Sequence, residues 1–156
     1  MLSPLLDEIR DALRLDIPPA LGVAYVTDAA ETRRLALADG NFGVPALSFL
    51  DDLGFSQTLL VHVPAHEADP DGVLAGLRRD VAGAAGHDRI PVLPFATADE
   101  LRRALATASF QAVYSQMTFD RRLYACGKAA FSMADLDCGA WGAHRTARRL
   151  ADRCRW

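Results

Sequence analysis

The chain has 156 residues, of which 51% are hydrophobic and 24% are charged, and its formal net charge is −3. These values are ordinary for globular proteins, and they exclude a disordered or fibrous chain. A chain of this length buries most of its apolar surface in one domain without disulfides or metals. We therefore interpret Cys126, Cys138 and Cys154 as free thiols in a reducing compartment.

Neither membrane insertion nor export is predicted. No run approaches the roughly 18 uninterrupted apolar residues of a membrane span. The first ten residues carry Asp7 and Glu8, where a secretory signal needs a basic segment followed by an apolar run. We therefore expect a cytoplasmic protein without membrane contact.

Charge is distributed unevenly along the chain. Residues 1–100 contain 7 Lys/Arg against 16 Asp/Glu, net −9, whereas residues 101–156 contain 10 against 4, net +6. Acidic and basic ends can bring copies together head to tail, or the basic part can meet a polyanion. The alternative is that the two halves interleave in the fold and their charges mix.

The first half of the chain predicts alternating helices and strands. Ser3 and Pro4 begin a helix predicted over 4–14, and a β-branched run at 21–26 predicts a strand. Asp28 and Glu31 form a capping box for a helix over 29–39. Residues 40–45 are expected to be a loop. The segments ALSFLDD (46–52) and TLLVHVPA (58–65) are expected to be strands joined as a hairpin.

The second half of the chain continues this alternation of helices and strands and ends with a predicted hairpin and a last helix. We expect a helix from Asp69 to about Gly86, a strand at 90–96, a helix capped by Thr97 and Glu100, and a strand at 110–117. Residues 121–131 are expected to pair back on that strand as a closing hairpin. Gly139 and Gly142 predict a broken last helix whose firm part is 143–153.

These segments define the expected fold class. It is a mixed α/β single domain over residues 1–156, with a mixed sheet of about six strands packed by about five helices, and its strand order is left open.

Acids and a histidine at predicted strand ends are the catalytic candidates. Asp51 and Asp52 close one strand and His62 lies near the end of the next, where α/β proteins place acids for catalysis. Neighbouring carboxylates on a strand point in opposite directions, however. Aspartate before a glycine-containing turn is also explained by bonds to its own backbone. Both interpretations stay open.

Three further motifs have ordinary structural explanations. His62, His66 and Glu67 have the spacing of a helical zinc site, but Pro64 interrupts the segment, so we predict no metal. The glycine-containing loop 40–43 follows a helix instead of opening one, so we predict no phosphate-bearing cofactor. The thiols combine with neighbouring residues (Asp120, Lys128, His144) into nucleophile-like or metal-like sets, but the spacing matches no known module.

Arginines concentrate at the C-terminus. On a helix, four of them share a face: Arg145, Arg148, Arg149 and Arg153. The stripe could bind phosphates or the acidic half of another copy, or it could be a solvated face. Trp141 and Trp156 nearby could cover the core or a partner.

The leading functional hypothesis is a non-catalytic binding or regulatory module. It would self-associate or contact an acidic protein or nucleic acid through the arginine helix. The alternative is a small hydrolase-like enzyme that uses Asp51 or Asp52 with His62.

Overall fold

The structure is a computed structural model that describes residues 21–37, 47–85, 90–115, 121–137 and 139–155. The helix expected over 4–14 and the loop expected at 40–45 lie outside the described residues. The elements are, in chain order, β1 (Gly22–Asp28), α2 (Ala29–Leu37), α3 (Leu47–Asp52), β2 (Ser56–His62), α4 (Pro70–Ala85), β3 (Val92–Phe95), α5 (Ala98–Thr107), β4 (Ala112–Tyr114), α6 (Arg121–Ala125), β5 (Ala129–Phe131), the 3₁₀ turn η1 (Met133–Asp135) and α7 (Gly139–Cys154).

The strands form one sheet in the order β3-β2-β1-β4-β5, and every pair is parallel. From β1 the chain builds outward to β3, then crosses back to β4 on the other side of β1 and continues to β5. This is the order of doubly wound α/β sheets, and it confirms the mixed α/β fold class. The sheet has five strands among the described residues instead of the expected six.

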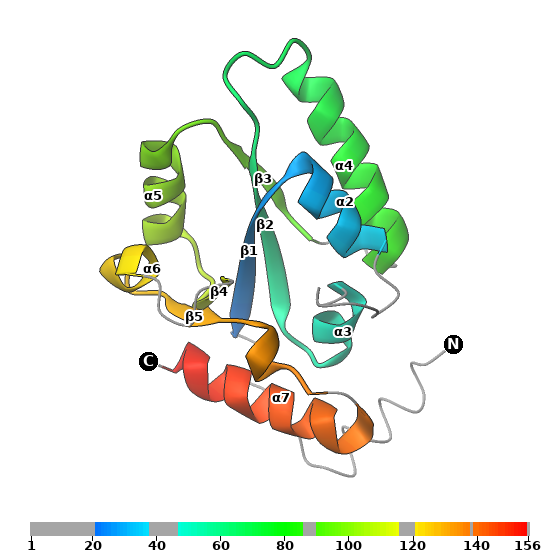
Figure 1. Cartoon of the computed structure of the whole chain (residues 1–156), viewed down its shortest axis with the longest axis vertical. Coiled ribbons are helices and arrows are strands. Elements are labelled where there is room, and N and C mark those ends of the chain that lie inside the picture. Colours follow the sequence, from blue (N-terminus) through cyan, green and yellow to red (C-terminus); the bar gives the residue numbers. More distant parts are fainter. Residues whose placement is uncertain (1–20, 38–46, 86–89, 116–120, 138, 156) are drawn as a thin grey trace.

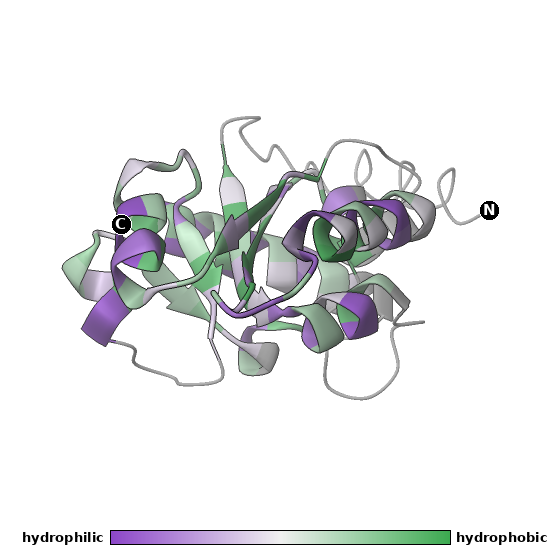
Figure 2. Cartoon of the chain, turned by 90° about the horizontal axis from the view of Figure 1, so that it is seen from above, coloured by the Kyte–Doolittle hydropathy of each residue, from purple (hydrophilic) through white to green (hydrophobic). Residues whose placement is uncertain are grey.

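Helices cover both faces of the sheet (Figure 1). On one face, α2, α3, α4 and α7 pack on a cluster that includes the buried Tyr25, Leu59 and Phe131. On the other face, α5 and α6 pack on residues one position along each strand, such as Ala24 and Leu60. Viewed from above, hydrophobic residues gather on the strands, and hydrophilic residues lie on the outer sides of the helices (Figure 2).

The prediction of a hairpin over residues 46–65 was wrong. Residues 47–52 form α3, and only the second segment is a strand, β2, which pairs in parallel with β1. Leu47, Leu50 and Leu53 are all buried, and a spacing of three residues matches a helical turn instead of a strand. Gly54, with φ of 89°, then turns the chain into β2.

The predictions of a closing hairpin and of a sheet with both parallel and antiparallel strands were also wrong. Residues 121–125 form α6, Gly127 turns with a φ of 69°, and the short strand β5 runs parallel to β4. A parallel pair needs a crossover connection, and α6 provides one on the α5 face of the sheet.

The last helix is longer than expected, because α7 is continuous from Gly139 to Cys154. Gly142 does not break it. A Cβ at this position would lie 2.6 Å from the carbonyl carbon of Asp137, so glycine allows the preceding segment to pass close to the helix. Within the described ranges, no helix is long and apolar enough to cross a membrane.

Candidate functional site

Doubly wound sheets bind ligands at the carboxyl ends of the strands where the strand order reverses, here between β1 and β4. Asp28, the last residue of β1, occupies this position. Its Oδ1 accepts a hydrogen bond of 2.7 Å from the backbone N–H of Glu31 and so caps α2. A phosphate bound at this helix end would need the free backbone N–H groups of the first turn of α2. The carboxylate of Asp28 already binds the N–H of Glu31 and repels an anion, so this helix end does not suit a phosphate.

Tyr114 ends β4 at the same place. Partial burial raises the pKa of its phenol, and the negative charge of Glu31 raises it further. Its ring packs against that of Tyr25, with centroids 5.8 Å apart, and Tyr25 is fully buried. The phenol of Tyr114 is therefore protonated at neutral pH, and its ring extends the core.

The structure does not bring the catalytic candidates together. Asp51 and Asp52 lie on α3, before the first residue of β2, whereas His62 is the last residue of that strand. Seven strand residues separate the two positions by about 20 Å. His62 is exposed and its ring packs on Phe95, with centroids 5.4 Å apart.

The lysine and the buried thiol that the sequence suggested as possible nucleophiles or metal ligands instead help to hold the fold together. Lys128 donates hydrogen bonds to the carbonyl oxygens of Ala108 (2.9 Å) and Phe110 (2.7 Å), just after α5 ends. Cys154 is buried near the start of β1, and burial raises the pKa of its thiol to about 11. Cys138 and Asp120 lie outside the described residues. Among the residues that are described, no group of His, Cys, Asp or Glu has the arrangement of a metal site.

Most of the arginine stripe on α7 is paired within the chain. Asp137 Oδ2 lies 2.8 Å from Arg145 Nε and 3.1 Å from Arg149 Nη1, and the hydrogen bond from Arg145 is the main cause that lowers the pKa of Asp137. Arg153 Nη2 lies 3.0 Å from Asp135 Oδ1. These ion pairs hold the segment that contains Asp135 and Asp137 against the side of α7. Arg148 is exposed and forms no ion pair within the described part of the chain.

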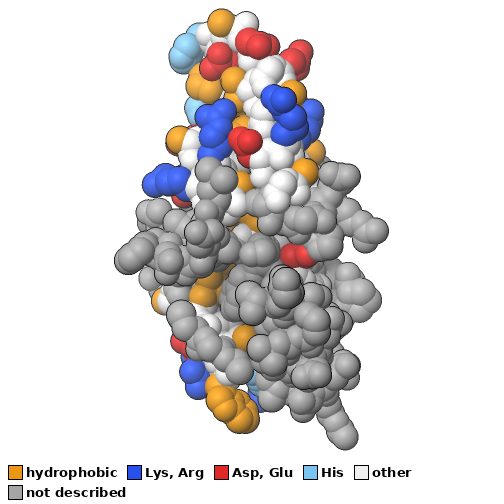
Figure 3. Space-filling view, turned by 90° about the vertical axis from the view of Figure 1, so that its right-hand side faces the viewer, with side chains coloured by type: hydrophobic (Ala, Val, Ile, Leu, Met, Phe, Trp, Pro, Cys, Tyr) orange, Lys and Arg blue, Asp and Glu red, His pale blue; other side chains and the backbone are white. Residues whose placement is uncertain are grey.

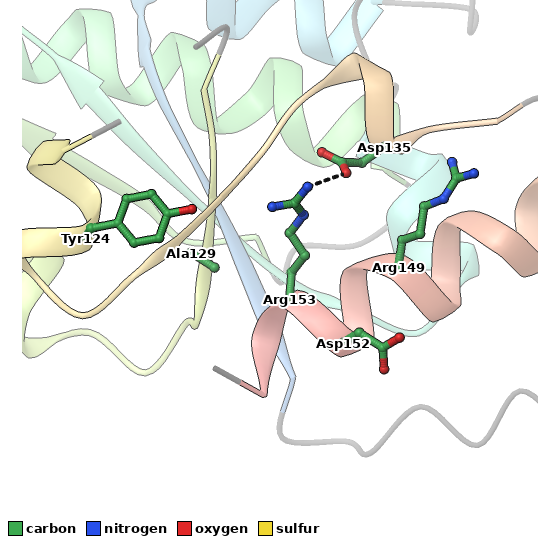
Figure 4. A pocket seen from close by; sticks show the side chains of 6 residues that line it. All are labelled: Tyr124, Ala129, Asp135, Arg149, Asp152 and Arg153. Carbon is green, nitrogen blue, oxygen red and sulfur yellow. Dashed lines mark hydrogen bonds and ion pairs between the residues drawn. The ribbon is translucent and has the colours of Figure 1, made fainter. Parts of the chain in front are cut away.

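A pocket of about 620 Å³ opens where α7 meets β5 and α6 (Figure 4). It is lined by Tyr124, Ala129, Asp135, Arg149, Asp152 and Arg153, and Arg153 points to Asp135 across it. Two arginines and two aspartates balance one another in this lining. The pocket therefore lacks the net positive charge that would concentrate an anion.

The outer face of α7 has a different character, and we define it by Trp141, Arg145, Arg148 and Arg149. The Trp141 side chain is 72% exposed, the largest value among the exposed large hydrophobic residues that are described. Arg145 and Arg148 follow it at positions i+4 and i+7, so all three lie in one row. The signal in the sequence that could have grouped Trp141 with the arginines is their spacing, because residues four and seven positions apart lie on the same side of a helix.

The fold and this surface define the class of the chain: a doubly wound parallel α/β domain with an arginine- and tryptophan-bearing face on its last helix. Comparisons of the chain with protein-family models, with curated proteins and with solved structures find no match.

Proposed function

We propose that the chain is a non-catalytic binding module that docks an acidic protein surface on the outer face of α7. The observation that carries the proposal is the exposure of Trp141, 72%, in a row with Arg145 and Arg148. Tryptophan and arginine are the residues most enriched at the energetic centres of protein interfaces. Leaving an indole in water is unfavourable, so a partner that covers it contributes apolar burial as well as charge pairing.

The charges around this face favour a protein over a nucleic acid. Asp135, Asp137 and Asp152 alternate with the arginines on and beside α7. A nucleic acid backbone presents negative charge at every step, so these carboxylates would repel it. An acidic protein surface carries separated carboxylates that can meet Arg148 and the exposed sides of Arg145 and Arg149.

Fluorescence anisotropy tests the proposal with a labelled acidic peptide in which single glutamates are separated by leucine and serine residues, and a single-stranded oligonucleotide of equal charge is the comparison. We expect salt-sensitive binding of the acidic peptide that is weakened roughly fivefold or more by Arg148→Glu and by Trp141→Ala. Arg79→Glu, on the exposed side of α4, is the matched control and leaves the affinity unchanged.

Two results would overturn the proposal. One is equal weakening by Arg79→Glu and Arg148→Glu, because the attraction would then depend on charge alone and not on this face. The other is tighter binding of the oligonucleotide than of the acidic peptide, which would make the partner a nucleic acid.

A further inference from the structure

A cleft lies at the opposite end of the molecule from α7. It has a volume of about 320 Å³ and opens at the carboxyl ends of β2 and β3, beside the first turns of α4 and α5. Its lining is largely apolar and includes Val63, Pro64, Leu74, Pro94 and Phe95. Val63 and Leu74 belong to the main core, so the cleft has a packed floor.

Three carboxylates border this cleft: Glu67, Asp71 and Glu100. Glu100 is engaged, because its Oε2 accepts a hydrogen bond of 2.7 Å from the backbone N–H of Ala96. Glu67 is exposed, and its Oε1 accepts a longer hydrogen bond of 3.3 Å from the backbone N–H of Asp69. Asp71 is exposed and has no hydrogen bond or ion pair with another described residue. Acidic side chains gather at this end of the molecule, over the loop between β2 and α4 (Figure 3). An apolar floor with an anionic border suits an apolar group flanked by cations.

The outer face of α7 has the complementary arrangement. It presents one exposed indole, Trp141, followed by Arg145 and Arg148 one and two helical turns later. The loop between β2 and α4, which borders the cleft, lies at the opposite end of the molecule from α7, so the cleft and α7 cannot meet within one copy (Figure 1). They can meet between two copies.

Building on the function proposed above, we propose that the acidic partner of α7 is the cleft of a second copy of this chain. Trp141 enters the cleft of the next copy, and Arg145 and Arg148 pair with its Glu67 and Asp71. The two contacting surfaces differ, so the interface is heterologous, and each copy leaves one cleft and one helix free for a further copy. Assembly therefore proceeds head to tail.

Sedimentation velocity of the whole chain from about 10 to about 500 μM tests this assembly, because a contact centred on one indole and two exposed ion pairs gives at most micromolar affinity. The weight-average mass is expected to rise with concentration past that of a dimer at low salt and to fall at high salt. The control Arg79→Glu assembles like the unmodified chain. A monomer over the whole range at low salt would overturn the proposal.

Two double variants, each disabling one half of the contact, identify the two surfaces. Glu67→Arg with Asp71→Arg disables the cleft, and Trp141→Ala with Arg148→Ala disables the helix without creating an ion pair of reversed sign between the two variants. All four side chains are exposed, and far-ultraviolet circular dichroism checks that both variants fold. Each variant alone is expected to be monomeric.

Mixing the two variants in equal amounts restores one intact contact, from the unmodified helix of one variant to the unmodified cleft of the other. The mixture is therefore expected to form a dimer of one copy of each variant that grows no further. A mixture that stays monomeric would overturn the pairing, as would a cleft variant that assembles like the unmodified chain.

The outcomes separate this inference from the proposed function. If the chain stays monomeric but binds the acidic peptide in a way that Arg148→Glu weakens, the head-to-tail contact is wrong and the docking face of α7 stands. If the chain stays monomeric and does not bind the acidic peptide, both proposals fail.

Discussion

The carboxylate of Asp137 accepts a hydrogen bond of 2.8 Å from Nε of Arg145, the first arginine of the stripe on α7. The same carboxylate oxygen lies 3.1 Å from Arg149 Nη1. One aspartate therefore engages two of the cations on the outer face of α7, while Arg148 between them is left to solvent. An acidic partner must compete with Asp137 for these arginines.

Asp137→Asn is therefore expected to strengthen the binding of the acidic peptide by a few-fold, because it removes a negative charge beside the docking face and releases Arg145 and Arg149. Asp99→Asn is the matched control, since Asp99 pairs with the exposed Arg102 on α5, away from α7. Anisotropy titrations of both variants check this. Weaker binding by Asp137→Asn would show that the carboxylate helps the partner to bind.

The same substitution changes stability in a pH-dependent way. The hydrogen bond from Arg145 lowers the pKa of Asp137 in the folded chain, so the ion pair stabilises the fold above the ordinary aspartate pKa. This contribution is lost as the pH falls through the lowered pKa. Urea unfolding should show Asp137→Asn to be less stable than the parent chain at pH 7, with the difference disappearing in acid. A constant difference down to pH 2 would contradict the ion pair.

Gly142→Ala is expected to destabilise the fold by about 1–3 kcal/mol, although alanine favours helices, because the new Cβ would collide with the backbone of Asp137. Gly76→Ala on α4 is expected to have the opposite effect on stability. Nothing lies within 4 Å of a Cβ there, so this change should stabilise by about 0.5–1 kcal/mol. Equal effects of the two substitutions in urea unfolding would show that α7 and Asp137 are not in close contact.

The Cys154 thiol is expected to resist alkylation in the folded chain. It is 6% exposed, and burial raises its pKa to about 11, so little reactive thiolate exists at pH 8. Maleimide labelling followed by mass spectrometry should modify Cys154 only after unfolding, while the half-buried Cys126 reacts first. The raised pKa also means that stability falls as the pH rises from 9 towards 11, and Cys154→Ala should remove that part of the loss. Rapid native labelling of Cys154 would contradict its burial.

Local signals in the sequence predicted much of this fold. The caps Asp28 and Thr97 begin α2 and α5 as expected, because each side chain binds a nearby backbone N–H. The apolar runs of β1, β2 and β3 were also found as strands. The predictions for two short segments were wrong: α3 and α6 have six and five residues, too few for the sequence pattern to separate a helix from a strand before the buried positions are known. Parallel pairing of β5 depends on contacts distant in sequence.

The candidate site was predicted in part. The arginines of α7 follow from their spacing, but their pairing with Asp135 and Asp137 does not, because it depends on how the preceding segment lies along the helix. The cleft near Glu67 and Asp71 is formed by two strand ends and two helices, a set that no local pattern reveals.

The emission of Trp141 tests the central claim most directly, because it reports whether this side chain leaves water when a partner binds. A Trp156→Phe variant makes Trp141 the sole tryptophan of the chain. On addition of the acidic peptide, whose leucines can cover the indole, we predict a shift of the emission to shorter wavelength and protection from acrylamide quenching, from a free state in which Trp141 is 72% exposed. Saturable binding of the acidic peptide with unchanged emission and quenching would contradict the account.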